Sequence, residues 1–276
     1  MRDFEGRVAV VTGGGSGIGA AIGRHLAGEG MRVALADIEI DACEAAAGSI
    51  RDEGGRADAF SVDVTDSISL LRLAVEVEAR IGACQLLCAN AGVLQMGRLD
   101  SRSEEDWEWC LSVNLLGTIR SVRAFLPQMR RQEGEKHIVI TSSMAGLLAA
   151  GPAKGVYNTS KHAQMAYGET LRAELAEEGI GVSLLLPAGT ESRIAESARN
   201  RPSRLGETEI TDEDMQTLTA ALGEDGVATI GADEAVRNVA RGIRENAAWI
   251  VTHTSQRHLI ERRFEAILEA FDRAEE

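Results

Sequence analysis

The feature that most constrains this chain is a glycine-rich run placed between a predicted strand and a predicted helix. The run reads Thr12, Gly13, Gly14, Gly15, Ser16, Gly17, Ile18 and Gly19. The strict GxGxxG spacing fits nowhere in it, whereas GxxxGxG fits through Gly13, Gly17 and Gly19. Glycines allow a tight turn and let a pyrophosphate approach backbone N–H groups at a helix N-terminus, where the dipole favours an anion. Such a run can also be a simple turn, but its position between strand and helix predicts a dinucleotide-binding site.

An acidic residue, Asp37, ends the second predicted strand 18 residues after Gly19. This is near the distance expected for a carboxylate that accepts hydrogen bonds from the adenosine ribose. A carboxylate there repels a 2′-phosphate, and neither Ser16 in the glycine run nor Ile38 after the acid supplies a compensating cation. We therefore expect NAD rather than NADP. An alternative role for Asp37 is to cap the next helix, although Asp41 is also available for that.

Short apolar runs alternate with longer segments that carry Ala, Leu, Glu and Arg at helical spacing. The expected strands are 7–11, 32–36, 56–62, 85–89, 137–141 and 181–186. The expected helices are 17–29, 41–53, 67–81, 103–131 and 155–178, and C-cap positions fall at Gly30, Gly54, Gly82 and Gly179. Runs that are apolar throughout, such as 182–186, are typical of strands covered on both faces. The predicted fold class is α/β, a doubly wound parallel sheet of Rossmann type.

The alternation stops after Leu186. Residues 187–230 are mainly polar, and order resumes with an expected helix at 232–245, a strand at 249–252 and a last amphipathic helix at 255–273. An insertion after a late strand lies at the carboxyl edge of such a sheet, so 190–225 is expected to be a substrate lid. A surface loop is the alternative. The whole chain, 1–276, is expected to form a single dinucleotide-binding catalytic domain.

The charge of the chain argues against a nucleic-acid partner. Its formal net charge is −14 and its pI is near 4.9, so it would repel a phosphate backbone. The basic stretch 193–204 is flanked and interrupted by Glu191, Glu196 and Glu207, which favours a solvated face over a polyanion site.

Cysteine and histidine spacing predicts no metal site and no disulfide. Cys84 and Cys88 would lie about 13 Å apart in an extended strand, too far for either a shared ion or a disulfide. Reduced thiols fit a cytoplasmic compartment. The strand pattern at 8–11 begins without a basic leader or cleavage site, and no apolar run approaches twenty residues, so we expect neither secretion nor a membrane partner.

A tyrosine and a lysine at i, i+4 spacing form the candidate catalytic pair. Tyr157 and Lys161 begin a long helical pattern, and this spacing places the phenol and the ammonium on one face. The pair follows Ser143 by 14 residues. An isolated YxxxK match would be weak evidence, but this one stands in order behind the glycine run and the acid that ends the second strand.

With these motifs the sequence resembles the short-chain dehydrogenase/reductase family from Gly6 to about Thr252. Further matching positions are Asp63 and Val64 after the third strand, Asn90, Ala91 and Gly92 after the fourth, and Asn114 in the long helix. The resemblance implies that Asp63 and Val64 flank the adenine and that Asn90 to Gly92 line the cofactor trough. It also implies a catalytic tetrad, listed here in chain order: Asn114, Ser143, Tyr157 and Lys161.

The match departs from the family pattern after the sixth strand. The family usually has Pro-Gly there, whereas this chain reads Pro187, Ala188, Gly189, Thr190, Glu191 and Ser192. Ala188 lacks the backbone freedom of the customary glycine. Pro187 and Thr190 are still expected to contact the cofactor, with Ser192 as another candidate for the carboxamide.

The resemblance implies an oxidoreductase that transfers a hydride between NAD(H) and a secondary alcohol or ketone, and a homo-oligomer, tetramer or dimer. Tyr157 is expected to act as acid and base, its pKa lowered by Lys161 and by the nicotinamide ring. The expected substrate is hydrophobic or alicyclic, because the residues assigned to its pocket are largely apolar: Leu94, Met96, Met144, Leu147, Leu148 and Val156. Alternatives are an NADP-dependent carbonyl reductase, an epimerase or dehydratase, and a nucleotide-binding regulator without turnover.

Overall fold

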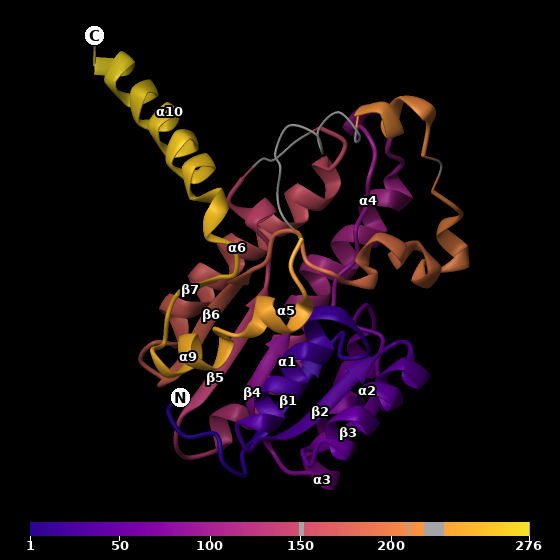
Figure 1. Cartoon of the computed structure of the whole chain (residues 1–276), viewed down its shortest axis with the longest axis vertical. Helices are drawn as coiled ribbons and strands as arrows, with labels where there is room; N and C mark the ends of the chain where they lie inside the picture. The colour runs from indigo at the N-terminus through magenta and orange to yellow at the C-terminus, as the bar shows by residue number, and fades with distance from the viewer. Residues whose placement is uncertain (149–151, 209, 218–228, 276) are drawn as a thin grey trace.

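Seven parallel strands form one sheet in the order β3-β2-β1-β4-β5-β6-β7 (Figure 1). The structure, a computed structural model, describes residues 1–276 except 149–151, 209, 218–228 and 276. The strands are β1 (Val8–Thr12), β2 (Arg32–Asp37), β3 (Arg56–Ser61), β4 (Cys84–Ala89), β5 (Lys136–Thr141), β6 (Ile180–Leu186) and β7 (Trp249–Val251). Every predicted strand is present, with its ends within one residue of those expected.

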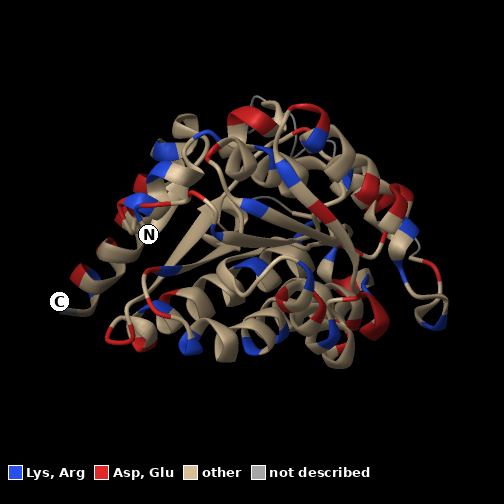
Figure 2. Ribbon diagram, turned by 90° about the horizontal axis from the view of Figure 1, so that it is seen from below, with Lys and Arg blue, Asp and Glu red and all other residues tan. Residues whose placement is uncertain are grey.

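Helices cover both faces of the sheet because alternate side chains of each strand are buried in opposite directions. In β1, Val8 and Val10 enter one apolar cluster, while Ala9 and Val11 enter another. The first cluster is covered by α3 (Ser67–Arg80), α5 (Gly117–Arg131) and α6 (Gly155–Leu175), and the second by α1 (Gly17–Gly28), α2 (Ile40–Asp52), α8 (Ala232–Val236) and α9 (Val239–Arg244). Figure 2 shows the sheet between these two layers, with charged residues mainly on helices and loops. The doubly wound, single-domain fold is confirmed.

Two predicted helices are interrupted. The expected helix 103–131 consists of α4 (Glu104–Leu111), a π-helical turn η2 (Ser112–Leu116) and α5. A π turn changes the backbone pairing locally and frees carbonyl groups for other donors. Here the carbonyl of Asn114 accepts from Thr118 Oγ1 at 2.8 Å and Gln164 Nε2 at 2.7 Å. The expected helix 232–245 is divided into α8 and α9.

The segment after β6 forms two short 3-10 helices, η4 (Arg193–Asn200) and η5 (Ser203–Leu205), before the chain returns to α8. Residues 209 and 218–225 of the predicted lid lie outside the described residues. The last helix, α10 (Arg257–Glu275), is shifted by two residues from the prediction and extends away from the rest of the molecule (Figure 1). None of the helices within the described ranges is both long and apolar enough to span a bilayer.

Candidate active site

A cavity of about 510 Å³ lies at the carboxyl ends of the strands. The strand order changes direction between β1 and β4, and the loops that follow these strands diverge there. The cavity is lined by residues that follow β1 to β6, including the glycine run, Asp37, Asp63, Asn90 and Ser143. The parallel topology therefore gathers motifs that are up to 175 residues apart in the sequence, from Gly13 to Ala188.

The glycine run is fixed by side chains from the strands that flank it. Thr12 Oγ1 accepts from the backbone N–H groups of Asn90 at 3.0 Å and Ala91 at 3.2 Å. Asn90 Nδ2 donates to the carbonyls of Thr12 at 3.1 Å and Gly13 at 3.3 Å. A Cβ atom at Gly19 would lie 1.9 Å from the Gly13 carbonyl oxygen, so only glycine fits there.

The start of α1 suits a pyrophosphate. Ser16 precedes the helix, its side chain makes no capping hydrogen bond, and Ser16, Gly17, Ile18 and Gly19 all line the cavity. Because the first backbone N–H groups of a helix lack intrahelical partners, they remain donors toward an anion. The residues present thus fit the phosphates of a dinucleotide.

Asp37 is held in place at the adenosine end of the cavity. One carboxylate oxygen accepts from Gly15 N–H at 2.9 Å, and the other accepts from Glu39 N–H at 3.0 Å. The helix α2 begins only at Ile40, so the alternative role of Asp37 as its cap is wrong. Gly15 does not line the cavity itself, and its backbone N–H holds Asp37, which does.

The other predicted cofactor residues lie where the sequence placed them. Each of them borders the cavity: Gly13, Ile38, Asp63, Val64, Asn90, Ala91, Gly92, Pro187 and Thr190. Asp63 accepts from Thr65 N–H at 2.8 Å and from its hydroxyl at 2.7 Å, which fixes the turn after β3.

Tyr157, Lys161 and Ser143 line the same cavity. Tyr157 and Lys161 lie in the first turns of α6, and Lys161 Nζ lies 5.6 Å from the centre of the Tyr157 ring. Lys161 Nζ donates to the Thr141 carbonyl at 3.1 Å. The Ser143 hydroxyl interacts with the Tyr157 phenol, and it donates a hydrogen bond to the Pro187 carbonyl at 3.2 Å. The phenol, the ammonium and the serine hydroxyl therefore face one reaction space.

Burial affects the two ionisable groups in opposite directions. It raises the pKa of Tyr157 to about 12, partly opposed by the Ser143 hydrogen bond, and it lowers the pKa of Lys161 to about 8. The sequence predicted a lowered pKa for Tyr157, whereas with the protein groups alone the pKa of Tyr157 is raised. Desolvation of the phenol is the larger effect, and the ammonium lies over the ring and bonds to Thr141.

Asn114 supports the site from behind and does not line the cavity. It is fully buried in the π turn, where Oδ1 accepts from Val93 N–H at 2.8 Å and Nδ2 donates to Ser160 Oγ at 2.9 Å. The Ser160 hydroxyl in turn donates to the Tyr157 carbonyl at 2.7 Å. Asn114 therefore links the loop after β4 to α6 and acts as a positioning residue behind the cavity.

A family model for short chain dehydrogenase matches residues 7–203. The chain belongs to the short-chain dehydrogenase/reductase family. A short-chain dehydrogenase/reductase from Burkholderia phymatum in complex with NAD has a TM-score of 0.90 and 35% identity, over 98% of this chain and 97% of that one. The C alpha-dehydrogenase of Sphingobium sp. strain SYK-6 is 32% identical over 98% of this chain and 88% of that protein. An uncharacterised NAD-dependent oxidoreductase of Mycobacterium tuberculosis is 36% identical over 70% and 74%. The protein is an oxidoreductase.

The unusual turn after β6 of this dehydrogenase/reductase is held by a histidine that the sequence did not single out. His253 Nε2 donates to the Gly189 carbonyl at 3.0 Å, while Nδ1 lies 2.6 Å from Thr252 Oγ1. Ala188 N–H also donates to Nδ1, at 3.4 Å. Since His253 follows β7 and lies 64 residues from Gly189, only the pairing of β6 with β7 reveals the contact.

The substrate end of the dehydrogenase cavity is largely apolar. Leu94, Met144 and Leu148 line it as expected, together with Trp109, Val113 and Ile194. Met96, Leu147 and Val156 do not line it, and Val156 is buried in the protein at 1% exposure. Half of the predicted pocket residues therefore belong to the surrounding packing.

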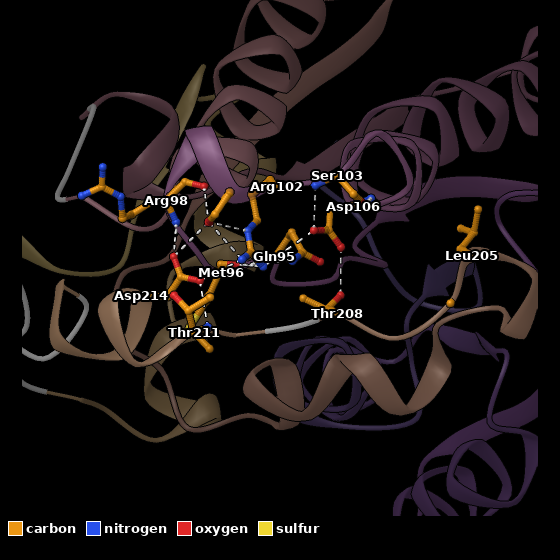
Figure 3. Close-up of polar contacts among 12 residues, drawn as sticks. Gln95, Met96, Arg98, Arg102, Ser103, Asp106, Leu205, Thr208, Thr211 and Asp214 are labelled. Atoms are coloured by element: carbon orange, nitrogen blue, oxygen red, sulfur yellow. Dashed lines mark hydrogen bonds and ion pairs between the residues drawn. The ribbon is translucent and has the colours of Figure 1, made fainter.

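The segment after β6 is anchored to α4 and to the turn before it by buried ion pairs, and Figure 3 shows contacts of Arg102, Asp106 and Asp214. Arg201 Nη1 lies 2.9 Å from Asp106, and Arg102 Nη2 lies 2.8 Å from Asp214; all four side chains are at most 5% exposed. Thr208 Oγ1 adds a 2.9 Å bond to Asp106. Ser197, Ile194 and Pro202 from the same segment line the cavity. The described part of the predicted lid is thus packed over the site.

Proposed function

We propose that this enzyme is an NAD-preferring alcohol dehydrogenase or carbonyl reductase that acts on a hydrophobic or alicyclic secondary alcohol or its ketone. One observation carries the proposal: Tyr157, Ser143 and Lys161 lie together on the wall of a cavity that is also lined by apolar side chains and by the start of α1. The name of the Sphingobium relative, C alpha-dehydrogenase, supports oxidation at an alcohol carbon.

The roles follow from position. Ser143 holds the substrate oxygen, and Tyr157 donates a proton to it in ketone reduction or removes one from the alcohol in oxidation. Bound NAD(H) accepts or supplies the hydride at its nicotinamide ring. The ammonium of Lys161 favours the phenolate, and Asn114 holds the loop and helix that carry these groups.

NAD preference is supported by Asp37, whose carboxylate lies where a ribose 2′-phosphate would bring further negative charge. An NADP-dependent carbonyl reductase is the second candidate, because Arg193 and Arg199 border the same end of the cavity. A regulator without turnover is disfavoured, since a binding protein has no use for a phenol, serine and lysine assembled around an empty apolar space.

We further propose that the chain forms a homo-oligomer in the cytoplasm, and that 190–225 is a lid that orders over the substrate. Its polar composition and its position above the cavity support the lid. Exposed apolar residues on α10 support assembly.

The decisive experiment replaces Tyr157 by phenylalanine. Tyr157→Phe should fold and bind NADH like the wild type, yet lose at least about a hundredfold in kcat, the lower range for a positioned acid or base. Tyr167→Phe is the matched control, because Tyr167 lies on the same helix and does not line the cavity. Steady-state rates with alicyclic alcohols and ketones provide the measurement. Retention of more than a tenth of wild-type turnover would refute the mechanism.

A further inference from the structure

Glu39 is the acceptor for three side chains from the segment after β6. Its carboxylate accepts from Arg199 Nε at 3.1 Å and Nη2 at 2.5 Å, and from Asn200 Nδ2 at 3.1 Å. Arg193 Nη1 lies 3.6 Å from the same carboxylate. Glu39 immediately precedes α2, whereas its partners belong to η4, about 160 residues later.

These contacts lie over the adenosine end of the cofactor cavity. Asp37, Glu39, Arg193, Arg199 and Asn200 all line the cavity. At the start of η4, the Ser192 Cβ lies 2.8 Å from the position that a Cβ on Gly17 would occupy. The segment that was expected to cover the substrate therefore also covers the glycine run and the residues around the ribose.

Each nitrogen of the Arg199 guanidinium donates to a protein group. Its Nε and Nη2 bond to Glu39, and its Nη1 donates to the Arg193 carbonyl at 3.0 Å. The hydrogen bond from Arg199 lowers the pKa of Glu39 to about 2, and the bond to Glu39 raises the pKa of Arg199. Both groups are charged throughout the neutral range, and Arg199 also interacts electrostatically with Asp37. Glu196 also pairs with Arg193 at 3.6 Å, so three acids face two arginines here.

Arginine is the side chain best suited to bind a phosphate, because its planar fork donates two parallel hydrogen bonds. A cation beside Asp37 would offset the repulsion between that carboxylate and a 2′-phosphate. We propose that Glu39 is a second determinant of cofactor choice, in addition to Asp37: it engages Arg193 and Arg199 and so withholds them from the 2′-phosphate of NADP(H). This inference rests on the proposed preference for NAD.

The test compares Glu39→Gln with Asp41→Asn, which removes the same charge from an exposed position two residues along. NADPH differs from NADH, and adenosine 2′,5′-bisphosphate differs from AMP, by the 2′-phosphate alone. Binding of these four ligands is measured by fluorescence and calorimetry. Thermal melting verifies that each variant is folded. Glu39→Gln should strengthen binding of both 2′-phosphorylated ligands at least tenfold and change NADH binding less than threefold. Adding Arg199→Gln to this variant should abolish most of the gain, and Asp41→Asn should show none.

Three results would overturn the role of Glu39. The first is unchanged NADPH binding in Glu39→Gln, and the second is an equal gain in NADPH affinity in Asp41→Asn. The third is an equal loss of NADH and NADPH binding in Glu39→Gln, which would show that Glu39 only holds η4 in place. A wild type that prefers NADPH would instead overturn the proposed NAD preference itself. Binding of AMP and adenosine 2′,5′-bisphosphate does not depend on Tyr157. The test of Glu39 can therefore be read even if the proposed reaction is wrong.

Discussion

Tyr157 and Lys161 are one helical turn apart, and their burial sets the pH range in which each can act. A phenol with a pKa raised to about 12 stays protonated near neutrality, while an ammonium with a pKa lowered to about 8 is mostly charged there. In this state the pair is ready to donate a proton to a ketone. Oxidation of an alcohol requires the phenolate, which Lys161 and the positive ring of NAD⁺ both favour.

The first prediction at the residue scale concerns this difference between the protonation states that reduction and oxidation require of Tyr157. Between pH 7 and pH 10, kcat/KM for alcohol oxidation should rise with pH, because the phenolate fraction grows toward a raised pKa. Ketone reduction should change little over most of this range. Lys161→Met should move the rise in oxidation to higher pH in whatever activity remains. Parallel pH profiles for the two directions would contradict the assignment of Tyr157 as the titrating group.

His137 gives a second prediction, on stability. It is fully buried in β5, Nε2 lies 2.8 Å from Ser183 Oγ, and Nδ1 has no hydrogen-bond partner. Burial lowers its pKa to about 3, against about 6.5 when unfolded. Below pH 6.5 the unfolded chain therefore takes up a proton that the folded protein does not, and the free energy of unfolding should fall by up to about 1.4 kcal/mol per pH unit.

Urea unfolding of the wild type and of His137→Gln between pH 7 and pH 5 tests this pH dependence of stability. The chosen range lies above the pH at which most carboxylates titrate. The variant should be less stable at pH 7 and lose less stability on acidification. The exposed His258→Gln should retain the wild-type slope. Equal slopes in all three proteins would show that His137 does not contribute.

Residues that act within one motif could be recognised from the sequence, whereas pairs formed across the fold could not. The YxxxK spacing and the acid after β2 identified Tyr157, Lys161 and Asp37, because each stands at a fixed distance from a local signal. Glu39 with Arg199, and His253 with Gly189, are 160 and 64 residues apart. Their proximity follows from sheet order and from the path of the segment after β6, which local pattern does not encode. The direction of the Tyr157 pKa shift was missed for the same reason, since it depends on burial.

At the scale of elements, the strands and most helices followed from hydrophobic pattern and glycine position. Gly30, Gly54, Gly82 and Gly179 all have positive φ, as expected after helix ends. The π turn in the predicted helix 103–131 could not be read in this way, because Ser112–Leu116 continues the helical pattern. Its cause is tertiary: Gln164 on α6 bonds to the Asn114 carbonyl. The segment after β6 has little pattern, so its buried ion pairs were also not predictable.

The anchoring of this segment leads to a prediction on Arg201. Its guanidinium pairs with Asp106, stacks 5.4 Å above the Trp109 ring and donates to the Gly206 carbonyl at 2.8 Å. Removing one partner of a buried ion pair is far more costly than removing an exposed one. In Arg201→Met, amide exchange in 193–208 should be at least tenfold faster than in the wild type. Arg204→Met, which removes an exposed pair to Glu108 from the same segment, should change exchange little.

The same exchange measurement tests the lid. Saturating NAD with a good alcohol substrate should slow exchange across 193–208, more than NAD alone. Protection that is identical with and without ligands would indicate a static cover. A uniform acceleration in Arg201→Met across the whole domain would show that Arg201 stabilises the fold as a whole and not this segment.

At the scale of the molecule, α10 is the element that the single-domain fold does not account for. It carries the exposed apolar residues Phe264, Ile267, Leu268 and Phe271 at helical spacing on one side, and it projects from the domain in both views (Figures 1 and 2). Helices in proteins gain most of their stability from packing of an apolar face, and these four side chains of α10 are exposed. The proposed homo-oligomer would cover this face with a second copy of the chain.

The last prediction follows from this face. Replacing Phe264 and Phe271 by glutamate should shift the protein toward monomer in sedimentation velocity at micromolar concentration, since each side chain would place a charge in the contact between copies. Ala266→Glu with Ala270→Glu adds the same two charges on the other side of the helix and should leave assembly unchanged. The cofactor cavity belongs to a single chain, so NADH should still bind to the dissociated variant. A wild type that is already monomeric, or a control that dissociates equally, would mean that α10 does not join copies of this enzyme.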